Sequence, residues 1–221
     1  MGSLQVGRAT CLPQYLPPLN GYPHFHRFIP RRGIFIFIKT DYPVGMDEIT
    51  DIRPGKWTLL VLNRGMHAPL LANLHRLAER SPLTVLDGGN RFNAYLVARG
   101  ARGQTELLER ITVSRAFTCY QMLTLLETTP ASPRPILVLD LLNTFYDESV
   151  RVHERRRLLE SCIFHLDRLS RPAGGAVTVH PPAVPSPEAI EFVRLLESHA
   201  ADVYLPQQPF ALPDATPLRL F

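Results

Sequence analysis

Four short runs of predominantly apolar residues constrain the fold of this chain more than any other feature. They cover residues 57–62, 83–86, 136–139 and 176–179, and a segment with a helical pattern follows each of them. Strands that are apolar on both faces belong inside a mostly parallel sheet with helices on both sides. The sequence therefore predicts an α/β protein with a twisted, mostly parallel sheet between two layers of helices.

The amino-terminal segment differs in composition from the rest of the chain. Residues 1–32 combine prolines with aromatic residues and show weak periodicity, which is typical of an irregular arm. We expect this arm to pack on a core domain formed by residues 33–221, either its own or that of a neighbour. Within the core, the pattern predicts strands over 34–38, 57–62, 83–86, 111–113, 136–139, 176–179 and 203–205, and helices over 70–80, 92–99, 120–127, 150–169 and 188–199.

Polar side chains directly follow several of the predicted strands. Asn63, Asp87, Asp140 and His180 each come just after one. In parallel α/β folds the functional site lies at the carboxyl ends of the strands, so we expect the site at this edge. Arg91 would project at the same edge, where it could bind an anion or a partner's carboxylate, or form a structural ion pair.

The segment between the first apolar run and its helix stands where a phosphate-binding loop would be. The P-loop pattern is G-x-x-x-x-G-K-[ST], whose backbone N–H groups, lysine and hydroxyl hold phosphates and Mg²⁺. Over residues 62–69 all of these signature positions are changed, and losing charged hydrogen bonds of about 1.5–3 kcal/mol each predicts little triphosphate affinity. One residue of this loop, Arg64, could still bind a phosphate with its guanidinium. The altered loop consists of Asn63, Arg64, Gly65, Met66, His67, Ala68 and Pro69.

Five further motifs follow one another along the chain. Residues 54–58 read Pro-Gly-Lys-Trp-Thr, 85–92 Val-Leu-Asp-Gly-Gly-Asn-Arg-Phe, 114–118 Ser-Arg-Ala-Phe-Thr, 137–140 Leu-Val-Leu-Asp and 178–180 Thr-Val-His. In this order they resemble five segments of the RecA/RadA recombinase ATPase family: the lead-in to the first core strand, the Asp-Thr-Glu segment with its Arg-Phe, the strand-to-helix step, the Walker B strand and the sensor strand. The resemblance covers roughly residues 50–206 and implies a RecA-like P-loop fold.

Where that family carries its catalytic groups, this chain carries others. Gly89 occupies the place of the glutamate that polarises the attacking water, and His180 that of the sensor glutamine. Asp140 stands in the Walker B place, but without a P-loop hydroxyl it has little Mg²⁺ to hold. The resemblance therefore implies a degenerate paralogue without an intact Walker A motif, in which Asp140, Asp87 and His180 are vestiges of the Walker B and sensor positions. We assign no catalytic residue and expect no cofactor.

A basic cluster opens the long helix that is predicted after the Walker B strand. It consists of Arg151, Arg155, Arg156 and Arg157. Arginines on one helix face can contact the phosphates of single-stranded DNA, which makes this a candidate nucleic-acid-binding surface. The alternative is a solvated helix face whose arginines pair with neighbouring glutamates.

Charge, apolar run length and cysteine content indicate the compartment and the kind of ligand to expect for the protein. The formal net charge is +4, and all but two of the 24 basic residues are arginines, an excess that does not by itself establish nucleic-acid binding. No apolar run reaches the length of a membrane span, and no secretory signal is visible. The three cysteines are scattered without metal-ligand spacing, which favours a reduced, cytoplasmic setting and predicts no metal site.

These observations lead to one preferred function and two alternatives. We expect a non-hydrolysing RecA/RadA-like paralogue that acts by binding, as an accessory or partner subunit in DNA recombination or repair. Its protein partner would be an active RecA-like ATPase or a second copy of the chain, and single-stranded DNA is a further candidate ligand. The alternatives are an atypical NTPase that uses Arg64 and Asp140, and a scaffold or regulatory protein that does not depend on DNA.

Overall fold

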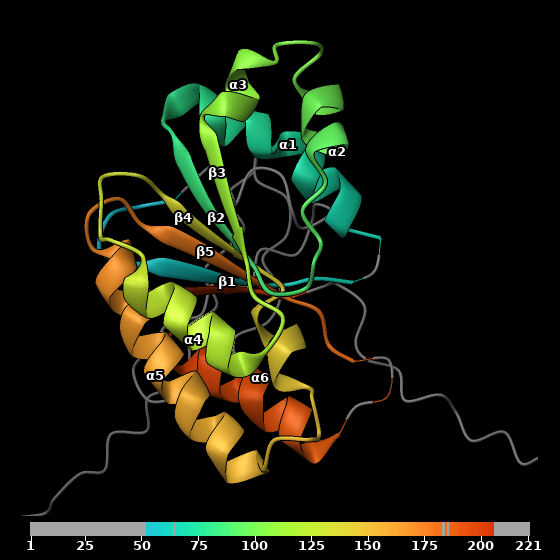
Figure 1. Ribbon diagram of the computed structural model, residues 1–221, viewed down its shortest axis with the longest axis vertical. Coiled ribbons are helices and arrows are strands. Elements are labelled where there is room, and N and C mark those ends of the chain that lie inside the picture. The colour runs from blue at the N-terminus through green and yellow to red at the C-terminus, as the bar shows by residue number, and fades with distance from the viewer. Residues whose placement is uncertain (1–51, 64, 183, 185, 206–221) are drawn as a thin grey trace, which may run out of the picture.

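The sheet of this protein is built from parallel strands. The computed structural model describes residues 52–63, 65–182, 184 and 186–205. Within them, six strands form one sheet in the order β3-β2-β4-β5-β1-β6, and each neighbouring pair is parallel (Figure 1). The strands are β1 (Trp57–Val61), β2 (Leu83–Asp87), β3 (Ile111–Arg115), β4 (Ile136–Leu139), β5 (Gly175–Val179) and β6 (Asp202–Tyr204).

Helices cover both faces of this sheet (Figure 1). One face carries α1 (His67–Arg80), α2 (Ala94–Gly100) and α3 (Glu106–Glu109), and the other carries α4 (Cys119–Thr128), α5 (Val152–Ser170) and α6 (Pro187–His199). A short 3-10 helix, η2 (Leu141–Phe145), follows β4. The predicted α/β fold class is confirmed, with a parallel sheet between two helical layers.

Side chains of the strands divide between two cores, because successive strand residues point to opposite faces. On β1, Leu59 and Val61 pack in the core beneath α4, α5 and α6, whereas Leu60 packs in the core beneath α1 and α2. The central strand β4 is buried along its whole length. This two-sided burial explains why the strands are apolar throughout instead of alternating with polar residues.

The observed helices differ from the predicted ones mainly at their first turns. α1 begins at His67 instead of residue 70, so Pro69 is its third residue; the first turn of a helix tolerates proline because its N–H groups have no intrahelical acceptor. α2 begins only at Ala94, because the side chain of Asn93 accepts hydrogen bonds from the next backbone N–H groups and caps the helix there. The sequence pattern does not predict α3 or η2, since such short turns carry too little periodicity.

Three predicted features lie outside the described residues. They are the arm over residues 1–32, the strand over 34–38 and the side chain of Arg64. The division into arm and core therefore stays a prediction. Among the helices that the structure describes, none is both long enough and apolar enough to cross a bilayer.

Candidate functional site

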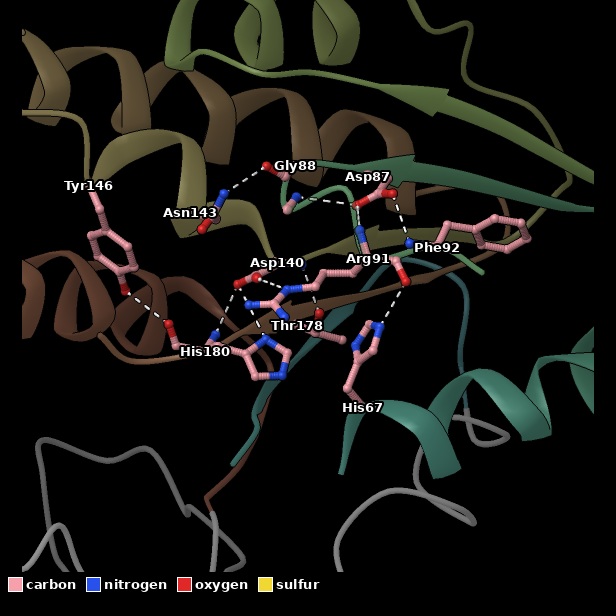
Figure 2. A network of polar contacts seen from close by, with 11 residues as sticks. His67, Asp87, Gly88, Arg91, Phe92, Asp140, Asn143, Tyr146, Thr178 and His180 are labelled. Carbon is pink, nitrogen blue, oxygen red and sulfur yellow. Dashed lines mark hydrogen bonds and ion pairs between the residues drawn. The ribbon is translucent and has the colours of Figure 1, made fainter. Parts of the chain in front are cut away.

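The strand order brings three of the predicted site residues to one edge of the sheet. β4 lies between β2 and β5, so the residues that end these strands become neighbours. Asp87 is the last residue of β2, Asp140 directly follows β4 and His180 directly follows β5 (Figure 2). They are far apart in the sequence, so their grouping is a consequence of the topology. We call these three residues the carboxyl-edge cluster.

Asp140 is buried, and side chains of the same chain neutralise its carboxylate. Only 1% of the residue is exposed. Its Oδ2 atom accepts a hydrogen bond from Nε of Arg91 at 3.1 Å, and its Oδ1 atom accepts one from the backbone N–H of His180 at 3.2 Å. Nδ1 of His180 also lies 3.3 Å from Oδ1. That contact lacks the direction of a hydrogen bond, so it is an electrostatic contact only.

The backbone and the charge state of Asp140 are both fixed by its surroundings. Its φ of 52° lies in the left-handed region, which aspartate enters more readily than most residues, and its N–H donates to the hydroxyl of Thr178 at 2.9 Å. Burial alone would raise the pKa of Asp140, but the contacts with His180 and Arg91 outweigh burial and hold this pKa below its usual value. The carboxylate is therefore ionised at neutral pH and paired within the chain.

Asp87 is also buried, but it bonds mainly to the backbone. Its Oδ1 atom accepts hydrogen bonds from the N–H groups of Gly89 at 3.2 Å and Arg91 at 2.9 Å, and its Oδ2 atom accepts one from Phe92 at 2.9 Å. Nε of Arg115 lies 3.4 Å from the same Oδ2. These bonds fix the turn over residues 88–92, from which the side chain of Arg91 points toward Asp140 (Figure 2).

This turn passes so close to its neighbours that a side chain at either of its glycines would require a shift. A Cβ atom on Gly89 would lie 2.6 Å from Oδ2 of Asp140, and one on Gly88 would lie 2.7 Å from the methyl group of Met122. Such distances are well inside van der Waals contact. A side chain at position 89 would therefore force Asp140 or the turn to shift.

The loop between β1 and α1 provides few polar groups among its described residues. The N–H of Gly65 donates to Oδ1 of Asn63 at 3.2 Å, and Met66 precedes α1 without forming a side-chain cap. Ala68 and Pro69 occupy the first turn of α1. This turn therefore offers neither the charged side chain nor the hydroxyl of a P-loop, and Pro69 removes one of the N–H groups that could bind an anion.

His67 connects this loop to the turn that carries Arg91. Its Nε2 atom lies 2.8 Å from the carbonyl oxygen of Arg91 and must donate, because a carbonyl only accepts. Its ring packs edge-on against His180 with the ring centroids 5.6 Å apart. Burial lowers the pKa of His67, although the hydrogen bond to Arg91 opposes that effect. A neutral imidazole thus lies where the second glycine of a P-loop would be (Figure 2).

The predicted basic cluster is divided between the interior and the surface. Arg155 is only 6% exposed, and its Nη1 atom donates to the carbonyl oxygen of Phe145 at 2.9 Å. Arg156 and Arg157 are exposed and form ion pairs with glutamates of α5 and α6. Arg151 lies at the exposed start of α5. These pairs are those of a solvated helix face, and DNA binding by the cluster stays a prediction.

Other residues that support the cluster were not identified from the sequence. Nδ2 of Asn143 donates to the carbonyl oxygen of Gly88 at 3.3 Å. The hydroxyl of Tyr146 donates to the carbonyl oxygen of His180 at 3.4 Å. Of these supporting residues, only Thr178, which accepts a hydrogen bond from the Asp140 N–H, could have been recognised from the sequence. It is a polar residue inside an otherwise apolar, fully buried strand. A buried polar group of this kind requires a partner.

The described residues offer no ready metal site. No group of three or more histidine, cysteine, aspartate or glutamate side chains among them is arranged to hold a metal ion. Magnesium in nucleotide sites is bound through carboxylates and substrate phosphates. In this cluster the carboxylate of Asp140 is already paired with the guanidinium of Arg91.

Comparisons with known proteins give limited information. No protein-family model matches this sequence, and no curated protein matches it. Among solved structures, the chain is similar to one described as the RadB recombinase, with a TM-score of 0.41 and 16% sequence identity. The match covers 61% of this chain and 65% of that chain. A similarity of this degree carries no argument about the site or its chemistry.

Proposed function

We propose that this protein is a RecA-like paralogue that binds its partners without hydrolysing nucleotide, as an accessory or partner subunit in DNA recombination or repair. The pairing of Asp140 carries this proposal. A Walker B aspartate normally steers Mg²⁺, whereas Asp140 pairs with Arg91 and contacts His180. The guanidinium of Arg91 therefore occupies the position next to the carboxylate that Mg²⁺ would take.

The neighbouring positions support the same interpretation. Gly89 cannot polarise a water molecule, and the packing around it leaves no room for a glutamate. Ala68 and Pro69 offer neither charge nor hydroxyl to a phosphate. Binding of Mg²⁺–nucleotide would require Arg91 to leave Asp140 and α1 to hold phosphates without these groups. The parallel sheet and its outer helices remain intact, and they can present surfaces to a partner.

The link to recombination or repair rests on the order of motifs over residues 50–206. In proteins with this order, function depends on contacts between neighbouring subunits as well as on nucleotide. We therefore expect the protein partner to be an active RecA-like ATPase or a second copy of this chain. The alternative is a scaffold that does not depend on DNA, and the DNA-binding experiment below distinguishes it from a DNA-binding subunit.

Nucleotide titration tests the central claim. The full-length protein is titrated with Mg²⁺–ATP by isothermal titration calorimetry, and phosphate release is followed with a sensitive fluorescent assay. We expect neither saturable heat nor turnover. Turnover that disappears in Asp140→Asn would overturn the proposal in favour of an atypical NTPase.

Binding to a single-stranded oligonucleotide across a salt series tests the DNA part. A protein that contacts phosphates loses affinity steeply as salt rises. We expect Arg151→Ala combined with Arg157→Ala to reduce that slope, whereas Arg76→Ala with Arg99→Ala, on the opposite face of the sheet, should leave it unchanged. Absence of binding at low salt would reject the DNA part and leave a DNA-independent scaffold.

A further inference from the structure

A pocket of about 410 Å³ lies beside the start of α5 and the amino-terminal end of α6. Its lining includes Tyr146 and Glu148 after η2, Arg155 of α5, and Glu188 and Phe192 of α6. The carboxyl-edge cluster contributes none of its three residues to this lining. A volume of this size accommodates one large side chain together with its backbone.

The charges around the pocket are predominantly acidic once internal bonds are considered. Arg155 is buried, donates from Nη1 to the Phe145 carbonyl at 2.9 Å, and lies 5.7 Å from the ring centroid of Phe192. Glu148 is exposed. The carboxylate of Glu188 accepts hydrogen bonds from its own backbone N–H and from the Ser186 side chain, which lower its pKa, so it is ionised at neutral pH. The lining therefore holds two carboxylates and one guanidinium, whose Nη1 atom donates to the Phe145 carbonyl.

One polar group in the lining lacks a partner. The Nε atom of Arg155 is buried and forms no hydrogen bond. Buried donors without an acceptor are rare in folded proteins, and such a group favours a ligand that brings an acceptor. The remaining walls include Pro182 and Val184, and Val184 is 82% exposed. An exposed apolar side chain at a pocket is suited to pack against the methylene groups of a ligand.

We propose that this pocket binds an arginine or lysine side chain presented by a peptide segment of a protein partner. The methylene stem packs on Pro182 and Val184, the cationic end pairs with Glu148 and Glu188, and a peptide carbonyl accepts a hydrogen bond from Arg155. Long basic side chains combine an apolar stem with a charged end in this way. The two carboxylates repel phosphates, which makes nucleic acid a poor occupant. This inference uses one part of the proposed function, namely that the protein binds a protein partner.

Peptide titration of the full-length, ¹⁵N-labelled protein tests the proposal by NMR. The probe is acetyl-Gly-Arg-Gly-amide, and the matched control peptide is acetyl-Gly-Glu-Gly-amide. We expect the arginine peptide to cause saturable shifts of the amide signals of Glu188, Ala189 and Phe192, and the glutamate peptide to cause none. Equal shifts with both peptides, or no saturable shift with either, would reject the pocket as a basic-residue site.

A variant pair sharpens this test. Glu148→Gln combined with Glu188→Gln should weaken binding of the arginine peptide about tenfold, as two partly exposed ion pairs would. Glu106→Gln combined with Glu109→Gln, on α3 across the sheet, should leave it unchanged. A short single-stranded oligonucleotide that shifts the same amide signals more strongly than the peptide would assign the pocket to nucleic acid and overturn the proposal. Nucleotide turnover at Asp140 would not affect these results, because the pocket uses different residues.

Discussion

Asp87 and Asp140 follow the same pattern in the sequence and have different roles in the structure. Both stand at the ends of neighbouring strands, and both are almost completely buried. Asp87 accepts hydrogen bonds from three backbone N–H groups, whereas Asp140 bonds to the Arg91 side chain and to His180. Asp87 is thus held mainly by the backbone, while Asp140 is held by one backbone N–H and by the Arg91 guanidinium, which a substitution can remove.

Asp87→Asn should have the strongest effect on stability. The amide replaces one carboxylate oxygen with an NH₂ donor, which then faces backbone N–H groups that need an acceptor. Leaving buried donors unpaired should lower the free energy of unfolding by about 2–4 kcal/mol. Urea denaturation followed by circular dichroism measures this loss. A loss smaller than that of Asp140→Asn would contradict the distinction between the two aspartates.

Gly89→Ala tests how closely the turn held by Asp87 packs on Asp140. The new methyl group would lie 2.6 Å from Oδ2, so the turn or the carboxylate must shift. We expect a loss of about 1–3 kcal/mol in the same denaturation experiment. Gly65→Ala is the matched control, since the nearest atom to its methyl group, Oδ1 of Asn63, lies at 3.6 Å. Equal stability of the two variants would show that Asp140 moves freely away from the turn.

Asp140→Asn should have a smaller effect, because the side chain of Arg91 is 47% exposed and water can solvate its charge. We expect a loss of about 1–2 kcal/mol at pH 7. The pKa of Asp140 is held below its ordinary 3.8, so the ion pair stabilises the fold fully above that pH and is lost as the pH falls through the lowered value. The difference between wild type and variant should therefore shrink in acid, and a constant difference would contradict the pairing.

His67→Gln should have the weakest effect and should appear mainly in the pH dependence. Burial lowers the pKa of His67 in the folded state below its ordinary 6.5, so the unfolded chain binds the proton more readily. Stability of the wild type should accordingly decrease as the pH falls below about 6.5. The glutamine variant should show a flatter profile between pH 7.5 and 5.5, and an unchanged profile would mean that His67 does not titrate differently on folding.

Much of the fold could be predicted from local pattern, since hydrophobic periodicity is a property of short segments. The strand over 136–139 and the helix over 188–199 agree closely with β4 and α6. The start of α1 at His67 could not be predicted, because the periodic apolar residues begin only at Leu70 and the sequence does not reveal the turn before them. The strand order could not be predicted either, because pairing depends on contacts between segments that are distant in the chain.

Part of the candidate site could likewise be predicted from the sequence, and part could not. Position after a strand was enough to single out Asp87, Asp140 and His180, because parallel strands end at one edge. The partner of Arg91 was left open, since reaching Asp140 requires the path of the turn over residues 88–92. The burial of Arg155 was also missed, because a helical pattern alone does not tell which arginine packs beneath α6 and which remain in water.

The sequence by itself determined the class of fold and which residues follow each strand, because apolar periodicity and residue chemistry can be read one segment at a time. Only the tertiary structure decided that Arg91 pairs with Asp140, that Gly89 packs directly against Asp140, and that Arg155 lines a pocket with two glutamates. These facts depend on distances between residues far apart in the chain. Such distances are set by how the sheet and its helices pack, and no single segment specifies them.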